Sequence, residues 1–165
     1  MDQGRRERLP GILSGIAGLA VLLLSLGPGP GWSVARDTAR SVGLTIVGVG
    51  MALVVWAAFR IRLGMLGEVE PAQGGLVKRG PYRLVRHPVY LGMTIALCGI
   101  PVALRSWLGL IGVLLLFLPS EIYRARLEER ALFRRFGSEW VEYATRTGFL
   151  LPFAGRASRD DFEQE

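Results

Sequence analysis

The residues best suited to chemistry form two short groups that lie far apart in the chain. The first group is the run RHPVYLG, residues 86–92, which contains the chain's one histidine, His87. The second group is the pair of adjacent acids Glu128 and Glu129. Imidazole and carboxylate groups can move protons, and arginine and tyrosine side chains can bind anions and cations. A fold that brings the two groups together would therefore form a site for a ligand of mixed charge.

The composition places this chemistry in a membrane protein. Half of the 165 residues are hydrophobic and the mean hydropathy is +0.34, which is too apolar for an ordinary soluble domain of this size. The net charge of +6 does not indicate nucleic-acid binding, because the basic residues lie in blocks between apolar runs. The single cysteine, Cys98, excludes an intramolecular disulfide and a thiol metal site, and we expect no metal centre.

Four apolar runs predict an all-α, polytopic membrane protein with about four transmembrane helices. The runs cover residues 9–26, 41–59, 89–104 and 107–123. A bilayer takes about 20 residues, so the first two runs are long enough to cross it and the last two are short. Only Arg105 and Ser106 separate the last two runs, which forces an antiparallel helical hairpin. Pro88 suits the first position of the third helix, because its missing N–H costs nothing there.

The distribution of charge predicts how these helices cross the membrane. Seventeen of the twenty Lys and Arg residues lie in residues 1–8, 60–88 and 124–165, and three lie in the other two loops. This positive-inside bias places both termini and the segment 60–88 in the cytoplasm. Nineteen of the twenty basic residues are arginine, which with the many Gly, Ala, Val and Leu residues indicates a GC-rich bacterial genome. The expected location is therefore a bacterial inner membrane.

The fourth helix is expected to continue past the membrane. Residues 124–136 contain no Gly or Pro, Gly137 fits a helix C-cap, and Ser138 can cap a short further helix. Two prolines should perturb the hairpin: Pro101 should end or kink the third helix, and Pro119 should bend the fourth.

The expected organisation has three parts. Residues 1–60 form two N-terminal transmembrane helices. Residues 61–153 form the catalytic part, which comprises a cytoplasmic loop, the helical hairpin extended into the cytoplasm, and the C-terminal helices. Residues 154–165 are polar and acidic and are expected to be a disordered tail.

The hairpin should bring the two chemical groups together, because the start of the third helix then lies beside the end of the fourth. Each feature alone has an ordinary explanation: arginines anchor to lipid phosphate, tyrosines lie in the interfacial belt, and acids pair along a helix. Together, a helix N-terminus with Arg83, Arg86 and His87 can hold an anion. Glu128 and Glu129 can accept hydrogen bonds from hydroxyls or an amine. S-adenosylmethionine carries all these groups, although other mixed-charge cofactors satisfy the same physics.

Two segments resemble the isoprenylcysteine carboxyl methyltransferase family and its bacterial and phospholipid-methyltransferase relatives. They are LVKRGPYRLVRHPVYLG, residues 76–92, and RLEERALFRRFGSEWVEYATRTGFLLP, residues 126–152, separated by the hydrophobic hairpin. The resemblance covers about residues 75–153 and implies an integral-membrane methyltransferase that binds S-adenosylmethionine. The cofactor-binding residues that it implies are Tyr82, Arg83, Arg86, His87, Pro88, Tyr90, Gly92, Glu128 and Glu129.

The expected reaction is in-line transfer of a methyl group to a nucleophile on a lipophilic substrate that enters from the lipid bilayer. A carboxylate nucleophile needs no general base, whereas an amine does, and His87, Glu128 and Glu129 are the candidate catalytic residues. A prenylated cysteine, an isoprenoid acid and a phospholipid amine all stay open as substrates. Two other classes also stay open: an NADPH-dependent membrane reductase of the sterol-reductase type, and a non-enzymatic lipid-binding membrane protein.

Overall fold

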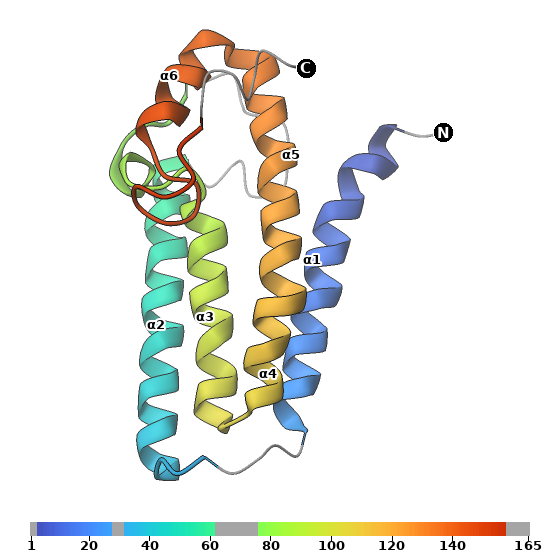
Figure 1. The fold of residues 1–165 in the computed structure, drawn as a ribbon, viewed down its shortest axis with the longest axis vertical. Helices are drawn as coiled ribbons and strands as arrows, with labels where there is room; N and C mark the ends of the chain where they lie inside the picture. The colour runs from blue at the N-terminus through green and yellow to red at the C-terminus, as the bar shows by residue number, and fades with distance from the viewer. Residues whose placement is uncertain (1–2, 28–31, 62–75, 158–165) are drawn as a thin grey trace. The chain divides into compact units, whose positions relative to one another are not determined.

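All the secondary-structure elements in the described part of the chain are helices, joined by turns and loops (Figure 1). A computed structural model describes residues 3–27, 32–61 and 76–157, with side chains from residue 9 onward. No β-strand forms within these residues, which confirms the all-α prediction. Residues 62–75 and 158–165 lie outside this description, and with them about half of the expected cytoplasmic segment 60–88 and most of the expected disordered tail.

Among the described residues, three helices are long and apolar enough to cross a membrane. They are Leu9–Leu26 within α1 (Gln3–Leu26), α2 (Arg36–Ile61), and the continuous helix Trp107–Phe136. A fourth apolar helix, α3 (Pro88–Leu104), is shorter and begins at the predicted proline. The protein is therefore an integral membrane protein, as predicted, while the side of the membrane on which each end lies stays a prediction.

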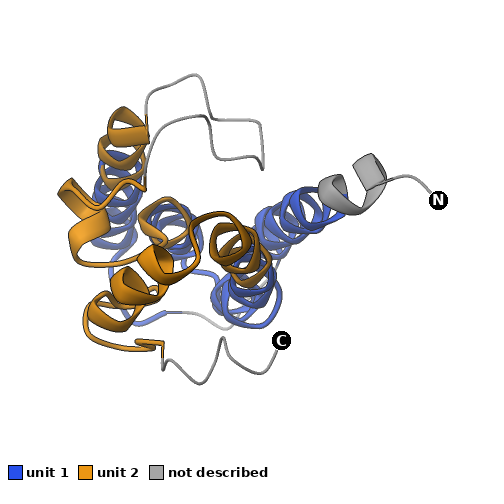
Figure 2. Ribbon diagram, turned by 90° about the horizontal axis from the view of Figure 1, so that it is seen from above, with its two compact units in different colours: residues 1–52, 92–124 blue, residues 53–91, 125–165 orange. Residues whose placement is uncertain are grey.

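The chain divides into two compact units, which are blue and orange in Figure 2. The first unit comprises residues 1–52 and 92–124, and the second comprises residues 53–91 and 125–165. Helix α1 belongs wholly to the first unit. Helices α2 and α3 each contribute residues to both, as does the continuous helix Trp107–Phe136.

A tight turn joins α3 to α4 (Trp107–Gly112) in the first unit. Arg105 has a φ of +56° and donates its N–H to the Val102 carbonyl, while Ser106 donates its N–H to the Pro101 carbonyl. This bond pattern is the Schellman motif, here with arginine in the left-handed position where glycine is usual. The Ser106 hydroxyl then accepts the Gly109 N–H and caps α4. Pro101 lies inside α3, whose helix ends at Leu104.

The membrane helix that starts with α4 changes its hydrogen-bonding pattern just before Pro119. A π-helical turn, η3 (Val113–Phe117), separates α4 from α5 (Leu118–Phe136). The Leu118 N–H donates to the Val113 carbonyl, which is a bond of π type. Pro119 has no N–H and cannot form the usual α-helical hydrogen bond. The π-helical turn therefore lies next to a position where the α-helical hydrogen bonding is already interrupted.

Glycines set the closest helix contacts of the first unit. A Cβ added at Gly50 of α2 would lie 2.5 Å from the carbonyl oxygen of Gly92 on α3, and Gly43 lies equally tightly against Gly99 and Ala103. A Cβ added at Gly48 would meet nothing within 4 Å. The backbones of α2 and α3 therefore approach each other through Gly43 and Gly50, as small residues allow in membrane helices. Gly48 has no such role.

The second unit has its own core around α6 (Ser138–Arg146). Trp140, Tyr143 and Ala144 are buried there, and partly buried apolar side chains of α5 pack against them. Gly137 has φ +52° and ψ −124° and is the N-cap of α6, with no side-chain capping bond. The prediction that Ser138 caps this helix is wrong: Ser138 is its first helical residue, because the chain reverses at a backbone conformation that favours glycine.

The two neighbouring glycines of α2 give a direct test of this packing. Gly50→Ala should lower the free energy of unfolding by about 1–3 kcal/mol, because its methyl group would overlap the backbone of α3. Gly48→Ala should leave it unchanged or raise it by about 0.5–1 kcal/mol, since alanine favours a helix more than glycine does. Thermal unfolding of both variants in the same detergent measures the difference. Equal shifts for the two alanines would contradict the close approach at Gly50.

Candidate active site

The segment before α3 is fixed to the chain that follows α6, within the second unit. Val85 forms an isolated parallel β-bridge with Gly148. The Arg86 N–H donates to the Gly148 carbonyl over 2.8 Å, and the His87 N–H donates to the Phe149 carbonyl over 3.3 Å. These backbone bonds fix Arg86 and His87 directly before Pro88, whose ring disfavours a helical backbone at His87.

Arg86 is buried and bonded to protein groups on several sides. Its Nη1 donates to the carbonyls of Ala144 and Thr147 over 2.7 and 2.6 Å. Its Nη2 donates to the Gly155 carbonyl over 3.0 Å, and its Nε pairs with Glu129 Oε1 at 2.5 Å. Ala144 and Thr147 lie at the C-terminal end of α6, where carbonyls lack helical partners and the helix dipole favours a cation. Arg86 therefore joins the loop, α5, α6 and the segment after α6.

His87 lies between the two predicted acids. Its Nε2 is 3.2 Å from Glu129 Oε1, and its Nδ1 is 3.8 Å from Glu128 Oε2. A carboxylate oxygen only accepts hydrogen bonds, so Nε2 carries the proton in the bond to Glu129. Tyr90 donates its hydroxyl to Glu128 Oε2 over 2.8 Å. The structure thus brings together the two groups of residues, although they are about forty residues apart in the sequence.

The two acids differ in their access to solvent. The Glu129 side chain is 14% exposed, whereas the Glu128 side chain is 40% exposed. The His87 side chain is 2% exposed. Of the three predicted catalytic residues, Glu128 is therefore the one with a carboxylate open to a ligand.

Phe149 is a residue of this site that the sequence reasoning did not select. Its ring makes an edge contact with the His87 ring, with 5.1 Å between the ring centroids. The guanidinium groups of Arg86 and Arg126 lie 5.6 and 5.7 Å from its centroid. Tyr90 stacks on His87 at 5.5 Å, so His87 has an aromatic ring on two sides. The one sequence signal for Phe149 is its place in the second of the two family-like segments.

Tyr82 and Tyr143 lie at the site with protonated hydroxyl groups. The Tyr143 hydroxyl donates to the Tyr82 carbonyl over 2.6 Å, which ties α6 to η2, the 3₁₀ turn Gly80–Arg83. Burial raises the pKa of the Tyr82 phenol, and the nearby Glu128 carboxylate and Tyr143 raise it further. Burial likewise raises the pKa of the Tyr143 phenol well above its usual value, against the lowering effect of Arg86. Both phenols therefore keep their protons at neutral pH and can serve as hydrogen-bond donors.

The remaining predicted residues occupy different surroundings. Pro88 is the first residue of α3 and is fully buried. Arg83 is exposed at the end of η2. Gly92 belongs to the first unit, where its carbonyl oxygen lies against Gly50 of α2, and it is the missing side chain of Gly50 that permits this approach of the two helices. No cluster of metal-ligating side chains exists among the described residues.

Residues 154–157, assigned from the sequence to a disordered tail, make specific contacts in the second unit. The Phe149 N–H donates to the Ala154 carbonyl over 2.8 Å, and the Ala157 N–H donates to the Ala144 carbonyl over 3.2 Å. Gly155 supplies the carbonyl that Arg86 Nη2 contacts. This part of the segment therefore helps to hold Arg86, while residues 158–165 lie outside the described chain.

Removing the Arg86 guanidinium should cost far more stability than removing that of its exposed neighbour. Arg86→Ala removes the guanidinium that pairs with Glu129 and donates to the Thr147 and Gly155 carbonyls, so the free energy of unfolding should fall by about 3 kcal/mol or more. Arg83→Ala should change it by less than about 0.5 kcal/mol. Thermal denaturation in detergent, followed by circular dichroism, compares the two. An Arg86→Ala protein as stable as Arg83→Ala would contradict the bonding described for Arg86.

The chain is similar to known membrane methyltransferases. Residues 38–139 match the family model described as phospholipid methyltransferase. Methanethiol S-methyltransferase from Pseudomonas deceptionensis is 29% identical over 73% of this chain and 49% of that protein. Protein-S-isoprenylcysteine O-methyltransferase from Saccharomyces cerevisiae is 36% identical over 47% of this chain and 33% of that protein.

The fold also matches a solved structure. The eukaryotic intramembrane Ras methyltransferase, an isoprenylcysteine carboxyl methyltransferase, aligns with a TM-score of 0.61 and 20% identity, over 93% of this chain and 54% of that chain. The chain thus spans about half the length of the first relative and of this structure. The family model covers more than half of the chain and includes both motifs of the site. The protein belongs to the phospholipid methyltransferase family.

Proposed function

We propose that this protein is an integral-membrane methyltransferase that uses S-adenosylmethionine and acts on a lipophilic substrate. The observation that carries the proposal is the meeting of the two motifs, in which Tyr90 and His87 contact Glu128 and Glu129. The relatives support the same chemistry, since those named above are all methyltransferases.

The side chains at this site fit the charges of the cofactor. The half-exposed Glu128 carboxylate can accept hydrogen bonds from an ammonium group or from ribose hydroxyls. The aromatic face of Tyr90 can attract a cation, and Arg83 offers an exposed guanidinium for a carboxylate. When bound, S-adenosylmethionine supplies a methyl group on a positively charged sulfur. Tyr90 and Glu128, which are in contact, thus match the two positive groups of the cofactor, and Arg83 matches its carboxylate by charge.

The residues of the site have distinct roles in this proposal. Glu128 contacts the ligand, because its carboxylate is the exposed one. Glu129 and His87 are nearly enclosed and hold the geometry: Glu129 balances the charge of Arg86 and accepts the bond from His87. Tyr90 orients Glu128 through its hydroxyl. Catalysis then depends mainly on alignment of the reactants and exclusion of water.

The substrate class decides whether a base is needed. A carboxylate acceptor reacts without loss of a proton, whereas a thiol or an amine must lose one. Glu128 is the candidate base in the latter cases, because it is the exposed carboxylate of the site. One relative is named for a small thiol and another for prenylated cysteine, so thiols join the prenylcysteine, isoprenoid acid and phospholipid amine classes as candidates.

The orientation proposed for the protein follows from its charges. Seventeen of the twenty basic residues lie in the segments assigned to one side of the membrane. By the positive-inside rule these segments, and both termini, face the cytoplasm of a bacterial inner membrane. The cofactor would then enter from the cytoplasm and the substrate from the bilayer.

A binding measurement on the purified protein tests the cofactor. The protein should bind S-adenosylmethionine, and Glu128→Gln should weaken binding by about tenfold or more, because a charge-assisted hydrogen bond is lost. Glu142→Gln is the matched control, since Glu142 is exposed on α6 and pairs with Arg146. Isothermal titration calorimetry gives the dissociation constants, and thermal unfolding confirms that both variants fold.

Two results would defeat this assignment. If the folded protein does not bind S-adenosylmethionine, this cofactor is excluded. If NADPH instead stabilises the protein against thermal unfolding, a membrane reductase is favoured. Equal affinities of Glu128→Gln and Glu142→Gln would show that the ligand lies elsewhere.

The substrate can be found by transfer of a labelled methyl group. Membranes that contain the protein, incubated with S-adenosylmethionine labelled on its methyl group, should yield a labelled product that partitions into organic solvent. Separate assays with a thiol, a prenylated cysteine and phosphatidylethanolamine identify the acceptor atom. Failure to label any lipid, thiol or peptide fraction would favour a non-enzymatic membrane protein.

A further inference from the structure

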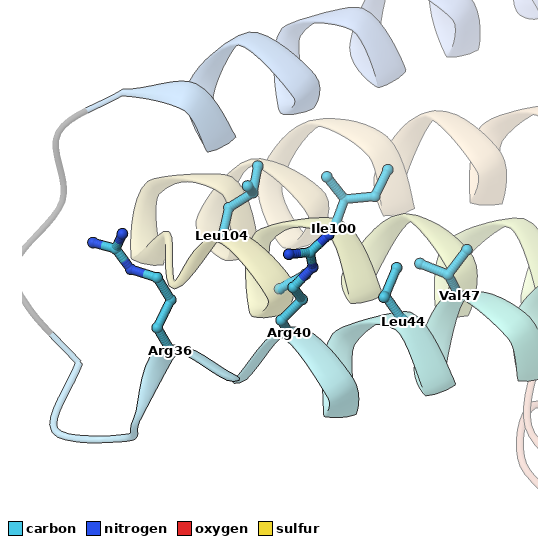
Figure 3. Close-up of a pocket in the computed structure, with 7 residues that line it drawn as sticks. Arg36, Arg40, Leu44, Val47, Ile100 and Leu104 are labelled. Carbon is cyan, nitrogen blue, oxygen red and sulfur yellow. The ribbon is translucent and has the colours of Figure 1, made fainter. Parts of the chain in front are cut away.

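The first unit contains a pocket that the proposed methyl transfer does not use. It has a volume of about 430 Å³ and lies between the beginning of α2 and the end of α3 (Figure 3). Its lining residues are Arg36, Arg40, Leu44, Val47, Ile100, Ala103 and Leu104. The volume falls within the range of about 300–1,000 Å³ that is typical of small-molecule sites. The pocket therefore has room for part of a ligand, and its walls are aliphatic apart from the two arginines.

The two arginines give this apolar pocket a positive end. Arg36 and Arg40 are four residues apart on α2, so they lie on the same face of the helix. Figure 3 shows the Arg40 guanidinium reaching toward Ile100 of α3. Neither guanidinium forms an ion pair or hydrogen bond with another residue in the described part of the chain, and both arginines are exposed. Asp37, in the first turn of α2, is the acid next to them and is also exposed.

The sequence of α2 places these arginines at the level of the lipid headgroups. Residues 41–59 contain no charged side chain, and about 20 apolar residues cross the hydrocarbon core of a bilayer. Arg36 and Arg40 therefore lie at one edge of the hydrocarbon. Leu44 and Leu104 are 58% and 49% exposed, so the apolar part of the pocket is open on the side where acyl chains lie.

We propose that this pocket binds one anionic phospholipid. The lipid phosphate pairs with the guanidinium groups of Arg36 and Arg40, and an acyl chain lies against Leu44, Val47 and Ile100. Charge complementarity selects this occupant: two unpaired cations border an aliphatic surface, and a phospholipid with net negative charge carries both matching parts. A zwitterionic lipid would bind more weakly, because its ammonium group offsets the charge of its phosphate.

Native mass spectrometry of delipidated protein tests the proposal. Offered dioleoyl phosphatidylglycerol and dioleoyl phosphatidylcholine in equal amounts, the protein should retain one phosphatidylglycerol in preference by about tenfold, as expected for a site with two charge-assisted contacts. The double variant R36Q/R40Q should lose this preference. The control R134Q/R146Q, which removes the same charge from exposed positions on α5 and α6, should keep it.

Further variants and a competition experiment distinguish a bound lipid from other ligands and from a misfolded protein. Leu44→Trp keeps both arginines but fills the pocket, so it should weaken retention of phosphatidylglycerol, whereas R36K/R40K should preserve it. Millimolar inorganic phosphate should not displace the lipid. The proposal is overturned if the two lipids are retained equally, or if the preference survives in R36Q/R40Q. Displacement by free phosphate, or a protein dimer that excludes lipid, would overturn it in favour of a simple anion or a second copy of the chain.

Discussion

The second unit depends on the burial of one guanidinium. Arg86 donates to the carbonyls of Ala144, Thr147 and Gly155 and pairs with Glu129, so a single side chain connects segments that are distant in sequence. Burying a charge is costly unless it is paired and hydrogen-bonded, and here both conditions are met. The same bonds place Glu129 against His87, and His87 in turn lies beside Tyr90 and Glu128. The proposed ligand site therefore depends on the hydrogen bonds and the ion pair that the Arg86 guanidinium forms.

In this arrangement, different residues hold the geometry of the site and contact the ligand. Residues that are close to fully buried hold the geometry, while Glu128 presents a carboxylate to the outside. The buried charges of Arg86 and Glu129 neutralise each other, so Glu128 is the acid of this pair that needs a ligand or water as its partner. In the first unit, glycines bring α2 and α3 together, and the pocket beside them carries the unpaired arginines of α2.

The sequence predicted the features that depend on local pattern. Length and hydropathy located the membrane helices, Pro88 marked the start of α3, and the absence of Gly and Pro after Tyr123 predicted the long extension of the last membrane helix. The expected hairpin and the family resemblance predicted that the Glu128–Glu129 pair lies beside the segment that contains His87, but not which acid His87 contacts. The carbonyl partners of Arg86 could not be predicted, because a backbone acceptor leaves no residue-type signal. Phe149 was missed for a related reason, since its role comes from the bridge between Val85 and Gly148.

Photochemical labelling can locate the cofactor on the protein. The purified protein would be irradiated with S-adenosylmethionine that carries a tritiated methyl group, then digested, and the labelled peptide sequenced. The label should be found in the peptides that contain Tyr90 or Glu128, and excess S-adenosylhomocysteine should prevent the labelling. Label confined to other parts of the chain, or unaffected by the competitor, would contradict a cofactor site built on Arg86, His87 and the two acids.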